Sequence, residues 1–412
     1  MVHSSLQMAR SDMNILFYTR DIPYPITSGH HIRTFHYVNA LLQNHHVVLA
    51  AYGDRKEEHA GILYFESSGC VVYLIGPRKN FNRCQRILSI FGTLLTTLPY
   101  AVKMREDTST REALAELVKK EKFDLVICDG IHLAPNLPAN IGCKTILDEH
   151  NIESMLVKRY ALTVNNPIKK FAAFAEHRKF VRFERRTWDQ FNEIHVCSEV
   201  DRDHVLQRVS KPAVRVVPNP VDTEKLQPLE ITKKPFSLIY TGLMGWKPNV
   251  DAVIYFVNSI YPLIKHAVPE VNFTIVGKNP TPAVQKLGKK DRSISIIGYV
   301  EDISTYILEH SVFIVPLRIG SGTRLKILEA MALGKAIVST TVGCEGLDVH
   351  HGKNILIADD PRDFSSAVVH LLLNHLLNDL LGKNGRLLVE GKYSVKIMKE
   401  SLNNYVDTFS TS

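Results

Sequence analysis

The stretch of sequence that decides the fold covers residues 313–340 and reads FIVPLRIGSGTRLKILEAMALGKAIVST. It opens with a short apolar run at residues 313–316, which is typical of a buried strand. Apolar side chains then recur at helical spacing over residues 325–332, and Gly334 stands where a C-terminal helix cap belongs. A second apolar run follows at residues 336–339. The stretch therefore predicts a strand, a glycine-rich loop, a helix and a second strand.

The loop before this helix has the features of an anion site. Its glycines allow the backbone to approach a ligand closely, and the start of a helix offers unpaired backbone N–H groups. Two cations follow at once, Arg324 and Lys326, so the arrangement suits a phosphate or a diphosphate. One turn further along, the carboxylate of Glu329 could accept hydrogen bonds from paired sugar hydroxyls. The alternative is an ordinary βαβ unit whose Arg and Lys are solvated.

Strand and helix patterns alternate on both sides of this stretch. Apolar runs occur at residues 14–18, 46–51, 71–75, 125–128, 145–147, 194–197 and 214–217. Residues 219–235 interrupt this pattern with three prolines, which is typical of a linker. The apolar runs resume at residues 237–240, 273–276, 294–297, 313–316, 336–339 and 355–357. This alternation predicts two doubly wound α/β domains, each a parallel sheet with helices on both faces. Ligands of such sheets bind at the carboxyl ends of the strands.

Composition narrows the classes of function. The chain has 412 residues and a formal net charge of +8, which favours an anionic partner. Its six cysteines form no C-x-x-C pair, which predicts reduced thiols and neither a zinc site nor a disulfide framework. The N-terminus lacks the apolar core of a signal peptide, and no apolar run is long enough for a membrane span. We therefore expect a cytoplasmic protein.

The whole stretch at residues 313–340 resembles the sugar-nucleotide site of retaining glycosyltransferases with the GT-B fold, the large family four group. Two glutamates separated by seven residues mark that site in the family; the second is Glu329 here, and Ser321 occupies the position of the first. The resemblance covers nearly the whole chain. It implies two Rossmann-like domains facing across a cleft, residues 13–222 for the acceptor and residues 223–394 for the sugar nucleotide, with the terminal helix at residues 395–412 packing back on the first. It also implies retention of configuration, a nucleoside-diphosphate sugar as co-substrate, and no cofactor or metal.

Two positions in the first domain carry candidate site residues. Gly29 frees the backbone immediately before a helix, which is typical of either an anion site or a plain β–α turn. The family often has paired glycines here, and His30 replaces the second. His150 follows a predicted strand, where a histidine could be structural or could bind a sugar hydroxyl. The resemblance assigns contact with the donor sugar to His150.

In the second domain, relatives use an Arg and a Lys after the first strand to hold the diphosphate. This chain offers only Lys247 there, so we hypothesise that Arg324 and Lys326 supply the missing charge. Glu329 would hold the donor, at its ribose. The other substrate-binding residues implied by the resemblance are Gly277, Tyr299, Val300, Gly320, Ser321, Gly322, Thr323, Leu325 and Glu345. Neither a dinucleotide fingerprint nor a P-loop is present.

Two basic segments indicate a further partner. Residues 78–105 combine cations with apolar residues at helical spacing, and residues 167–188 hold seven Lys or Arg against two Glu. Such helices pack on a domain, are solvated, or lie on an anionic membrane surface. Membrane contact at the inner face of the cell membrane would suit a lipid-linked acceptor. No recognised nucleic-acid module accompanies the charge, so nucleic acid is not expected as a partner.

The resemblance implies a hexosyltransferase-type enzyme that moves a sugar from a nucleoside-diphosphate donor to a glycan or lipid-linked acceptor, in the synthesis of a cell-surface polysaccharide or glycolipid. Arg324, Lys326 and the helix start would neutralise charge on the departing diphosphate. The alternatives are a sugar-nucleotide epimerase of the same fold and a catalytically silent binding or scaffold protein, which Ser321 and the single Gly29 favour.

Overall fold

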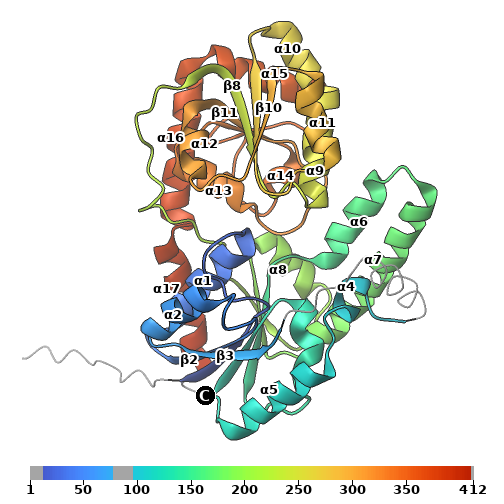
Figure 1. The fold of residues 1–412 in the computed structure, drawn as a ribbon, viewed down its shortest axis with the longest axis vertical. Coiled ribbons are helices and arrows are strands. Elements are labelled where there is room, and N and C mark those ends of the chain that lie inside the picture. Colours follow the sequence, from blue (N-terminus) through green and yellow to red (C-terminus); the bar gives the residue numbers. More distant parts are fainter. Residues whose placement is uncertain (1–12, 78–95, 410–412) are drawn as a thin grey trace, which may run out of the picture. The chain divides into compact units, whose positions relative to one another are not determined.

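The computed structural model describes residues 13–77 and 96–409, which form two compact units (Figure 1). Unit 1 contains the described residues up to His150, residues 178–217, and those from Met398 on. Unit 2 contains residues 151–177 and 218–397. Each unit has its own hydrophobic core and its own parallel sheet. The expected fold class, GT-B with two Rossmann-like units, is confirmed.

The sheet of unit 1 has seven strands in the order β3-β2-β1-β4-β5-β6-β7, all parallel. They are β1 (Asn14–Tyr18), β2 (His46–Tyr52), β3 (Val71–Gly76), β4 (Leu125–Asp129), β5 (Lys144–Glu149), β6 (Glu193–Val196) and β7 (Ala213–Val216). The central strands are apolar on both faces because helices cover both. The strand order reverses between β1 and β4, so their carboxyl ends mark the crevice where such a sheet binds a ligand.

The helices of unit 1 fit the periodicity of the sequence. They are α1 (Gly29–Leu41), α2 (His59–Ser67), α4 (Tyr100–Lys103), α5 (Thr108–Lys120), the 3-10 helix η1 (Ile131–Asn136) and α8 (Glu199–Leu206). The final helix α17 (Val395–Val406), followed by η3 (Asp407–Phe409), contributes Met398, Leu402 and Val406 to the unit 1 core. These three side chains recur every fourth residue, so one face of α17 is buried.

The sheet of unit 2 has six parallel strands in the order β10-β9-β8-β11-β12-β13. They are β8 (Lys234–Thr241), β9 (Asn272–Val276), β10 (Ile294–Gly298), β11 (His310–Val315), β12 (Ile337–Ser339) and β13 (Leu356–Ile357). The order reverses between β8 and β11, which places the switch point at the stretch that decided the fold.

The helices of unit 2 are α9 (Lys247–Tyr255), the π-helix η2 (Phe256–Ile260), α10 (Tyr261–Ala267), α11 (Pro282–Lys290), α12 (Ile303–Glu309), α13 (Leu325–Ala332), α14 (Thr341–Cys344), α15 (Pro361–Leu373) and α16 (His375–Lys392). The predicted cap of α13 is confirmed: Gly334 has φ 66°, a conformation that favours glycine, and its N–H donates to the carbonyl of Met331.

Two further helices, α6 (Glu153–Thr163) and α7 (Pro167–Trp188), form a hairpin (Figure 1). His177 of α7 lies 2.9 Å from the carbonyl oxygen of Ser154 in α6, so the two helices run side by side. The predicted basic helix at residues 167–188 is therefore α7. Most of the other basic segment, residues 78–95, lies outside the described residues. Among the described helices, none is long and apolar enough to cross a membrane.

Candidate functional site

The glycine-rich loop before α13 is closed by the side chain of Arg324. The Arg324 guanidinium is buried, and its Nη1 donates to the carbonyl oxygen of Gly322 at 2.8 Å and to that of Ser321. A Cβ on Gly320 would lie 1.9 Å from Nη2 of Arg324, so a side chain at this position would displace the guanidinium. Thr323 fixes the loop from the other side, since its Oγ1 accepts a hydrogen bond of 2.7 Å from Asn219. Arg324 thus fixes the conformation of the loop, and its charged group is buried against the loop carbonyls.

The second cation of the loop, the ammonium of Lys326, lies at the carboxyl end of β8. Its Nζ donates to the carbonyl oxygen of Thr241 at 2.6 Å, to the Tyr240 hydroxyl at 2.9 Å and to Oδ1 of Asn249 at 3.0 Å. The same Nζ lies 4.1 Å from the centre of the Tyr240 ring. Burial, reinforced by the positive charge of Arg324, lowers the pKa of Lys326 to about 7. An anion placed here would stabilise the charged form of Lys326.

Two glycines keep the backbone beside Lys326 closely packed. A Cβ on Gly242, the residue after β8, would lie 2.8 Å from Nζ of Lys326. A Cβ on Gly277, the residue after β9, would lie 1.7 Å from the carbonyl oxygen of Gly242. Both glycines have φ 154°, in the region that favours glycine. The loops after β8 and β9 therefore meet Lys326 at the carboxyl ends of their strands.

Glu329 lies one turn beyond Lys326 on α13. Burial raises the pKa of the Glu329 carboxyl, and the charge of Lys326 partly opposes this rise. Leu325 opens the same helix and packs against the unit 2 core. Lys326 and Glu329 thus share a helix whose start is fixed by the core and by Arg324.

The remaining predicted residues of unit 2 have mixed surroundings. Lys247 opens α9 and lies over the ring of Tyr160, at 4.6 Å. Tyr299 and Val300 directly follow β10; the Tyr299 ring is exposed, and Nζ of Lys278 lies 4.1 Å from its centre. These rings and ammonium groups lie after strands β8, β9 and β10, where a planar base and a phosphate could be bound.

Arg159, on α6, is a contact of this site that the sequence did not predict. Its Nη1 and Nη2 donate to the two carboxylate oxygens of Glu345 at 2.5 and 2.6 Å. Nη1 also donates to the carbonyl oxygen of Gly320. Arg159 therefore neutralises Glu345 and holds the glycine-rich loop. Nothing in a basic helix distinguishes this one arginine from its neighbours, so the sequence carried no signal for it.

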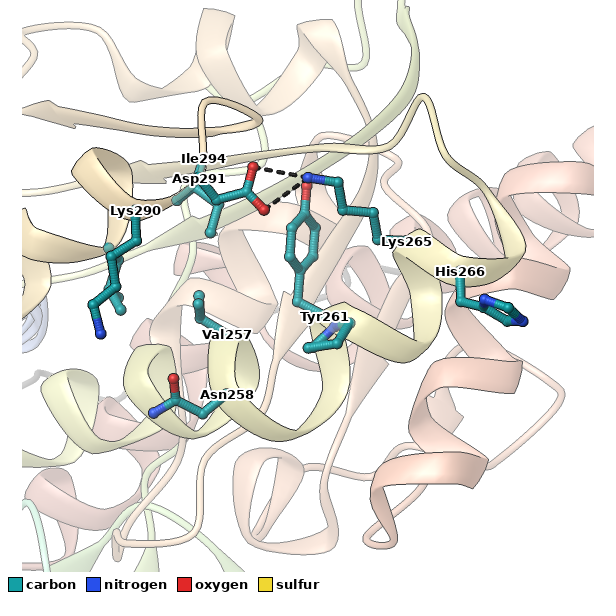
Figure 2. Close-up of a pocket in the computed structure, with 10 residues that line it drawn as sticks. Val257, Asn258, Tyr261, Lys265, His266, Lys290, Asp291 and Ile294 are labelled. Atoms are coloured by element: carbon teal, nitrogen blue, oxygen red, sulfur yellow. Dashed lines mark hydrogen bonds and ion pairs between the residues drawn. The ribbon is translucent and has the colours of Figure 1, made fainter.

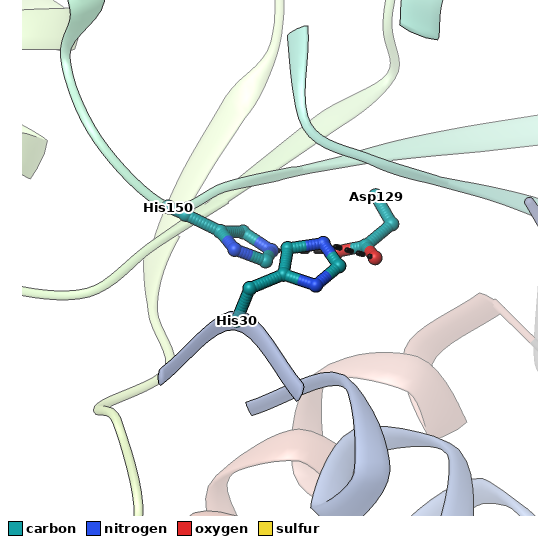
Figure 3. A group of neighbouring side chains, drawn as sticks. All are labelled: His30, Asp129 and His150. Atoms are coloured by element: carbon teal, nitrogen blue, oxygen red, sulfur yellow. Dashed lines mark ion pairs between the residues drawn. The ribbon is translucent and has the colours of Figure 1, made fainter. Parts of the chain in front are cut away.

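Unit 1 holds a second group of predicted residues, and Figure 3 shows its two histidines, His30 and His150, with Asp129. His30 is the second residue of α1, Asp129 ends β4, and His150 follows β5. Nε2 of His150 lies 2.6 Å from Oδ1 of Asp129 and 3.0 Å from Oδ2 of Asp148. Nε2 of His30 lies 3.1 Å from Oδ2 of Asp129, and the two imidazole rings are 5.0 Å apart. Buried Arg33 completes the chain, with Nε 2.9 Å from Oδ2 of Asp148.

This chain of alternating charges fixes the protonation of His150. Burial alone would lower the pKa of His150, but the carboxylates of Asp129 and Asp148 outweigh it and raise the pKa to about 10. Burial likewise opposes the charge of Asp148, yet Arg33 and His150 lower its pKa to about 2. The pKa of Asp129 lies well below its usual range because His30 and His150 outweigh burial. His150 is therefore an imidazolium at neutral pH.

The same cluster has the donor types of a metal site. One atom each from His30, Asp129 and His150 lies within 4.8 Å of the others, and imidazole with carboxylate is a common ligand set for zinc. A metal would have to displace the proton on Nε2 of His150, because the metal-binding form of imidazole is neutral. The short His150–Asp129 distance of 2.6 Å is that of a charge-assisted hydrogen bond. The cluster could hold a divalent cation only in competition with these ion pairs.

The predicted residues thus fall into two groups, one in each unit. Gly29, His30 and His150 gather at the carboxyl ends of β1, β4 and β5 in unit 1. The residues from Gly320 to Leu325, with Lys326, Glu329, Gly277 and Glu345, gather after β8, β9 and β11 in unit 2. The sequence did not single out Asp129 or Asp148. The two aspartates were detectable in principle, because each ends an apolar strand run.

A separate hollow of about 370 Å³ lies among η2, α10 and α11 of unit 2 (Figure 2). Two of its charged groups are paired with each other: Nζ of Lys265 lies 2.8 and 2.7 Å from the two carboxylate oxygens of Asp291. The Tyr261 hydroxyl donates to the carbonyl oxygen of Val271 at 2.9 Å. None of the predicted substrate-binding residues lines this hollow.

Sequence comparisons identify relatives of both halves of the chain. A family described as "Glycosyl transferases group 1" matches residues 235–374, and one described as "Glycosyltransferase Family 4" matches residues 27–225. An uncharacterised 44.6 kDa protein in the cps region of Klebsiella pneumoniae is 24% identical over 371 residues, which cover 87% of this chain and 91% of that protein. UDP-Gal:alpha-D-GlcNAc-diphosphoundecaprenol alpha-1,3-galactosyltransferase of Escherichia coli is 23% identical over 346 residues, covering 77% of this chain and 84% of that enzyme.

Solved structures share the fold at low sequence identity. HepE of Anabaena, crystallised with UDP and glucose, has a TM-score of 0.67 at 12% identity, over 97% of this chain and 100% of that one. Sucrose-phosphate synthase of Thermosynechococcus elongatus has a TM-score of 0.72 at 15% identity, with the same shares of 97% and 100%. These likenesses establish the arrangement of strands and helices described above.

Proposed function

Because the chain belongs to the group 1 glycosyltransferases, we propose that it transfers a sugar from a nucleoside-diphosphate donor to an acceptor hydroxyl with retention of configuration and without a metal. The observation that carries this proposal is the ammonium of Lys326. It is held beside Gly242 and Gly277 at the carboxyl ends of the central strands of unit 2, where a doubly wound sheet binds its ligand.

The proposed chemistry is stabilisation of the leaving group. As the bond to the sugar breaks, negative charge grows on the diphosphate, and a preorganised cation lowers the energy of that state. Lys326 would make direct contact with the diphosphate. Arg324 would act through the shape of the loop and through its charge, since its guanidinium binds the loop carbonyls. Glu329 would hold the donor ribose.

Unit 1 would contribute a fixed positive charge. His150 is an imidazolium held by Asp129 and Asp148, so it can donate hydrogen bonds but cannot act as a base near neutral pH. We propose that it orients the donor sugar by donating to a hydroxyl. His30 and Asp129 would hold His150 in place.

The proposed acceptor is a lipid-linked glycan used in cell-surface polysaccharide synthesis, at the inner face of the membrane. Two relatives support this class of acceptor. The name of the E. coli enzyme gives it a diphosphoundecaprenol-linked acceptor, and the name of the Klebsiella protein places it in the cps region.

The first test is thermal unfolding with UDP, GDP, ADP and dTDP in turn. A nucleotide at 100 times its dissociation constant should stabilise the protein by about 2.7 kcal/mol. Lys326→Met should lose most of the shift. Lys335→Met is the matched control, because Lys335 is also a buried lysine of unit 2 with a pKa lowered to about 7, yet its Nζ donates to the carbonyls of Leu308 and His310. Equal loss in both variants, or no shift with any nucleotide, would contradict the proposed site.

The rival functions differ in their products. Ser321, which is buried and uncharged, favours a silent binding protein. Transfer or hydrolysis of a sugar nucleotide would exclude that rival. An epimerase would convert the sugar nucleotide with no acceptor present, which chromatography of the nucleotide pool would detect.

A further inference from the structure

The connection between α6 and α7 exposes large apolar side chains. Every residue in the range 165–172 is exposed, and within it the side chains of Ile168 and Phe171 are 79% and 78% exposed. Leu162, in the last turn of α6, is 60% exposed. Ile168 and Phe171 are three residues apart on α7, so they lie on one face of the helix. We call Leu162 and residues 165–172 the hairpin tip.

The charge around the hairpin tip has one sign. Residues 154–175 contain Lys158, Arg159, Lys169 and Lys170 and no acidic residue. Arg159 is paired with Glu345, whereas Lys169 and Lys170 are exposed and stand between Ile168 and Phe171. The tip therefore presents two apolar side chains and two adjacent cations on the first turn of a helix.

We propose that the hairpin tip docks on an anionic lipid bilayer, with Ile168 and Phe171 inserted at the headgroup level and Lys169 and Lys170 on the lipid phosphates. Long lysine side chains can reach the headgroups while their neighbours are buried, and each cation near an anionic surface adds to the attraction. Apolar side chains flanked by lysines are the pattern of interfacial helices.

Charge complementarity selects this occupant. A protein partner for two isolated apolar side chains would need acidic groups to meet the lysines, whereas an anionic bilayer supplies both phosphates and an apolar interior. The inference rests on the proposed function in one respect: docking is useful because it would bring the enzyme to a lipid-linked acceptor. It does not rest on that function for its test.

The contact between α6 and the glycine-rich loop gives docking a structural link to the candidate site. Arg159 is on the same helix as Leu162, and its guanidinium binds Glu345 and the carbonyl of Gly320. One helix of the hairpin, α7, would thus be held at the membrane, while the other, α6, holds the loop before α13.

The test is co-sedimentation of the full chain with phosphatidylcholine vesicles, with and without phosphatidylglycerol. We expect binding only to the anionic vesicles, weakened by salt. Ile168→Ser/Phe171→Ser should lower the partition coefficient by about tenfold or more, since both apolar side chains lose their burial. Lys169→Gln/Lys170→Gln should also lower it by about tenfold or more. The matched control is Leu376→Ser on α16, where an 86% exposed leucine has Asp379 one turn away; its binding should not change.

Three outcomes would overturn the inference. They are no binding of the unaltered protein to anionic vesicles, equal binding by the Ile168→Ser/Phe171→Ser variant, and a loss of self-association in that variant with vesicle binding unchanged, which would make the tip a contact between copies of the chain. Nucleotide-dependent thermal shifts of the same variants should match those of the unaltered protein. If the unaltered protein bound anionic vesicles but showed no thermal shift with any nucleotide, that result would count against the proposed function alone.

Discussion

Lys326 and Lys335 are two buried lysines of unit 2 with different surroundings. Burial is the main reason that the pKa of each is lowered to about 7. Lys335 ends at the carbonyls of Leu308 and His310, at the C-terminal end of α12, where a cation satisfies unpaired carbonyl groups. Lys326 ends at the carbonyl oxygen of Thr241, beside Gly242, at the carboxyl end of β8. We propose Lys326, and not Lys335, as the donor contact because Lys326 lies at the carboxyl end of β8, where a doubly wound sheet binds its ligand.

The affinity for a nucleoside diphosphate should fall as pH rises. Lys326 loses its proton above its pKa of about 7 in the free protein, whereas a bound diphosphate restores the charged form, so binding takes up a proton. Affinity should drop by up to about tenfold per pH unit from about pH 7 to about pH 9. Arg324 and Glu329 are the charged groups that act on Lys326: the charge of Arg324 lowers the pKa of Lys326, and that of Glu329 raises it.

Calorimetry in two buffers of different ionisation enthalpy would measure that proton uptake directly. The Lys326→Met variant should bind the nucleoside diphosphate more weakly, and its affinity should not change with pH above neutral pH. A profile that stays steep in Lys326→Met would assign the titration to another group. Lys335→Met should keep the profile of the unaltered protein.

Asp148→Asn should strongly destabilise unit 1. It removes the carboxylate that pairs with the buried Arg33, and an unpaired buried charge costs about 3–5 kcal/mol. The midpoint of urea unfolding measures this loss. Arg202→Gln, at the exposed Arg202–Glu199 pair of 2.6 Å, is the control and should change stability by less than about 1 kcal/mol. Similar effects in both variants would mean that Arg33 is not held as described.

The same cluster sets a pH window for the stability of unit 1. The pKa of Asp148 in the folded protein is lowered to about 2. Its contribution to the free energy of unfolding is therefore complete above its unfolded pKa and is lost as pH falls through about 2. The pKa of His150 is raised to about 10, so its contribution is complete below about pH 6.5 and is lost as pH rises through about 10. His150→Gln should therefore destabilise the protein at neutral pH and much less above pH 10, which urea titrations at the two pH values would show. An equal loss at both values would contradict the imidazolium.

At the scale of elements, the local order of the chain was predictable and its tertiary partners were not. Residues 313–340 form β11, α13 and β12 as expected, and Asp302 caps α12 by accepting from the N–H of Ser304. These features follow from periodicity and turn chemistry, which act over a few residues. The contacts of Lys326 with Tyr240 and of Arg159 with Glu345 join residues more than 80 positions apart. Periodicity states which face of a helix is buried, but not which strand or loop meets it.

Gly277→Ala tests the close approach of the loops after β8 and β9. The new Cβ would lie 1.7 Å from the carbonyl oxygen of Gly242, at a φ of 154°, so the loops must separate. We expect a lower melting temperature and a loss of nucleotide binding of about tenfold or more, because Lys326 would lose its neighbours. Gly391→Ala in α16 is the matched control, since nothing lies within 4 Å of its Cβ and a helical alanine should stabilise by roughly 0.5–1 kcal/mol. Unchanged nucleotide binding in Gly277→Ala would place the donor elsewhere.

At the scale of the whole molecule, the chain builds two units but does not divide between them in sequence order. The last helix, α17, follows the helices of unit 2, yet its apolar face lies in the core of unit 1 with Tyr37. The α6–α7 hairpin likewise contributes residues to both units. Stability of unit 1 therefore depends on residues that follow unit 2 in the sequence.

Leu402→Ala should separate the stabilities of the two units. Leu402 is fully buried in the unit 1 core, so truncation should cost about 2–5 kcal/mol there and leave the unit 2 sheet untouched. In scanning calorimetry we expect a transition that moves down in this variant and a second that moves up with nucleotide, as binding at Lys326 stabilises unit 2 alone. Leu376→Ala, at an exposed leucine of α16, should leave the temperatures of both transitions unchanged. If nucleotide rescued the transition lowered by Leu402→Ala, the two units would unfold as one cooperative body, and donor binding would be a property of the whole chain.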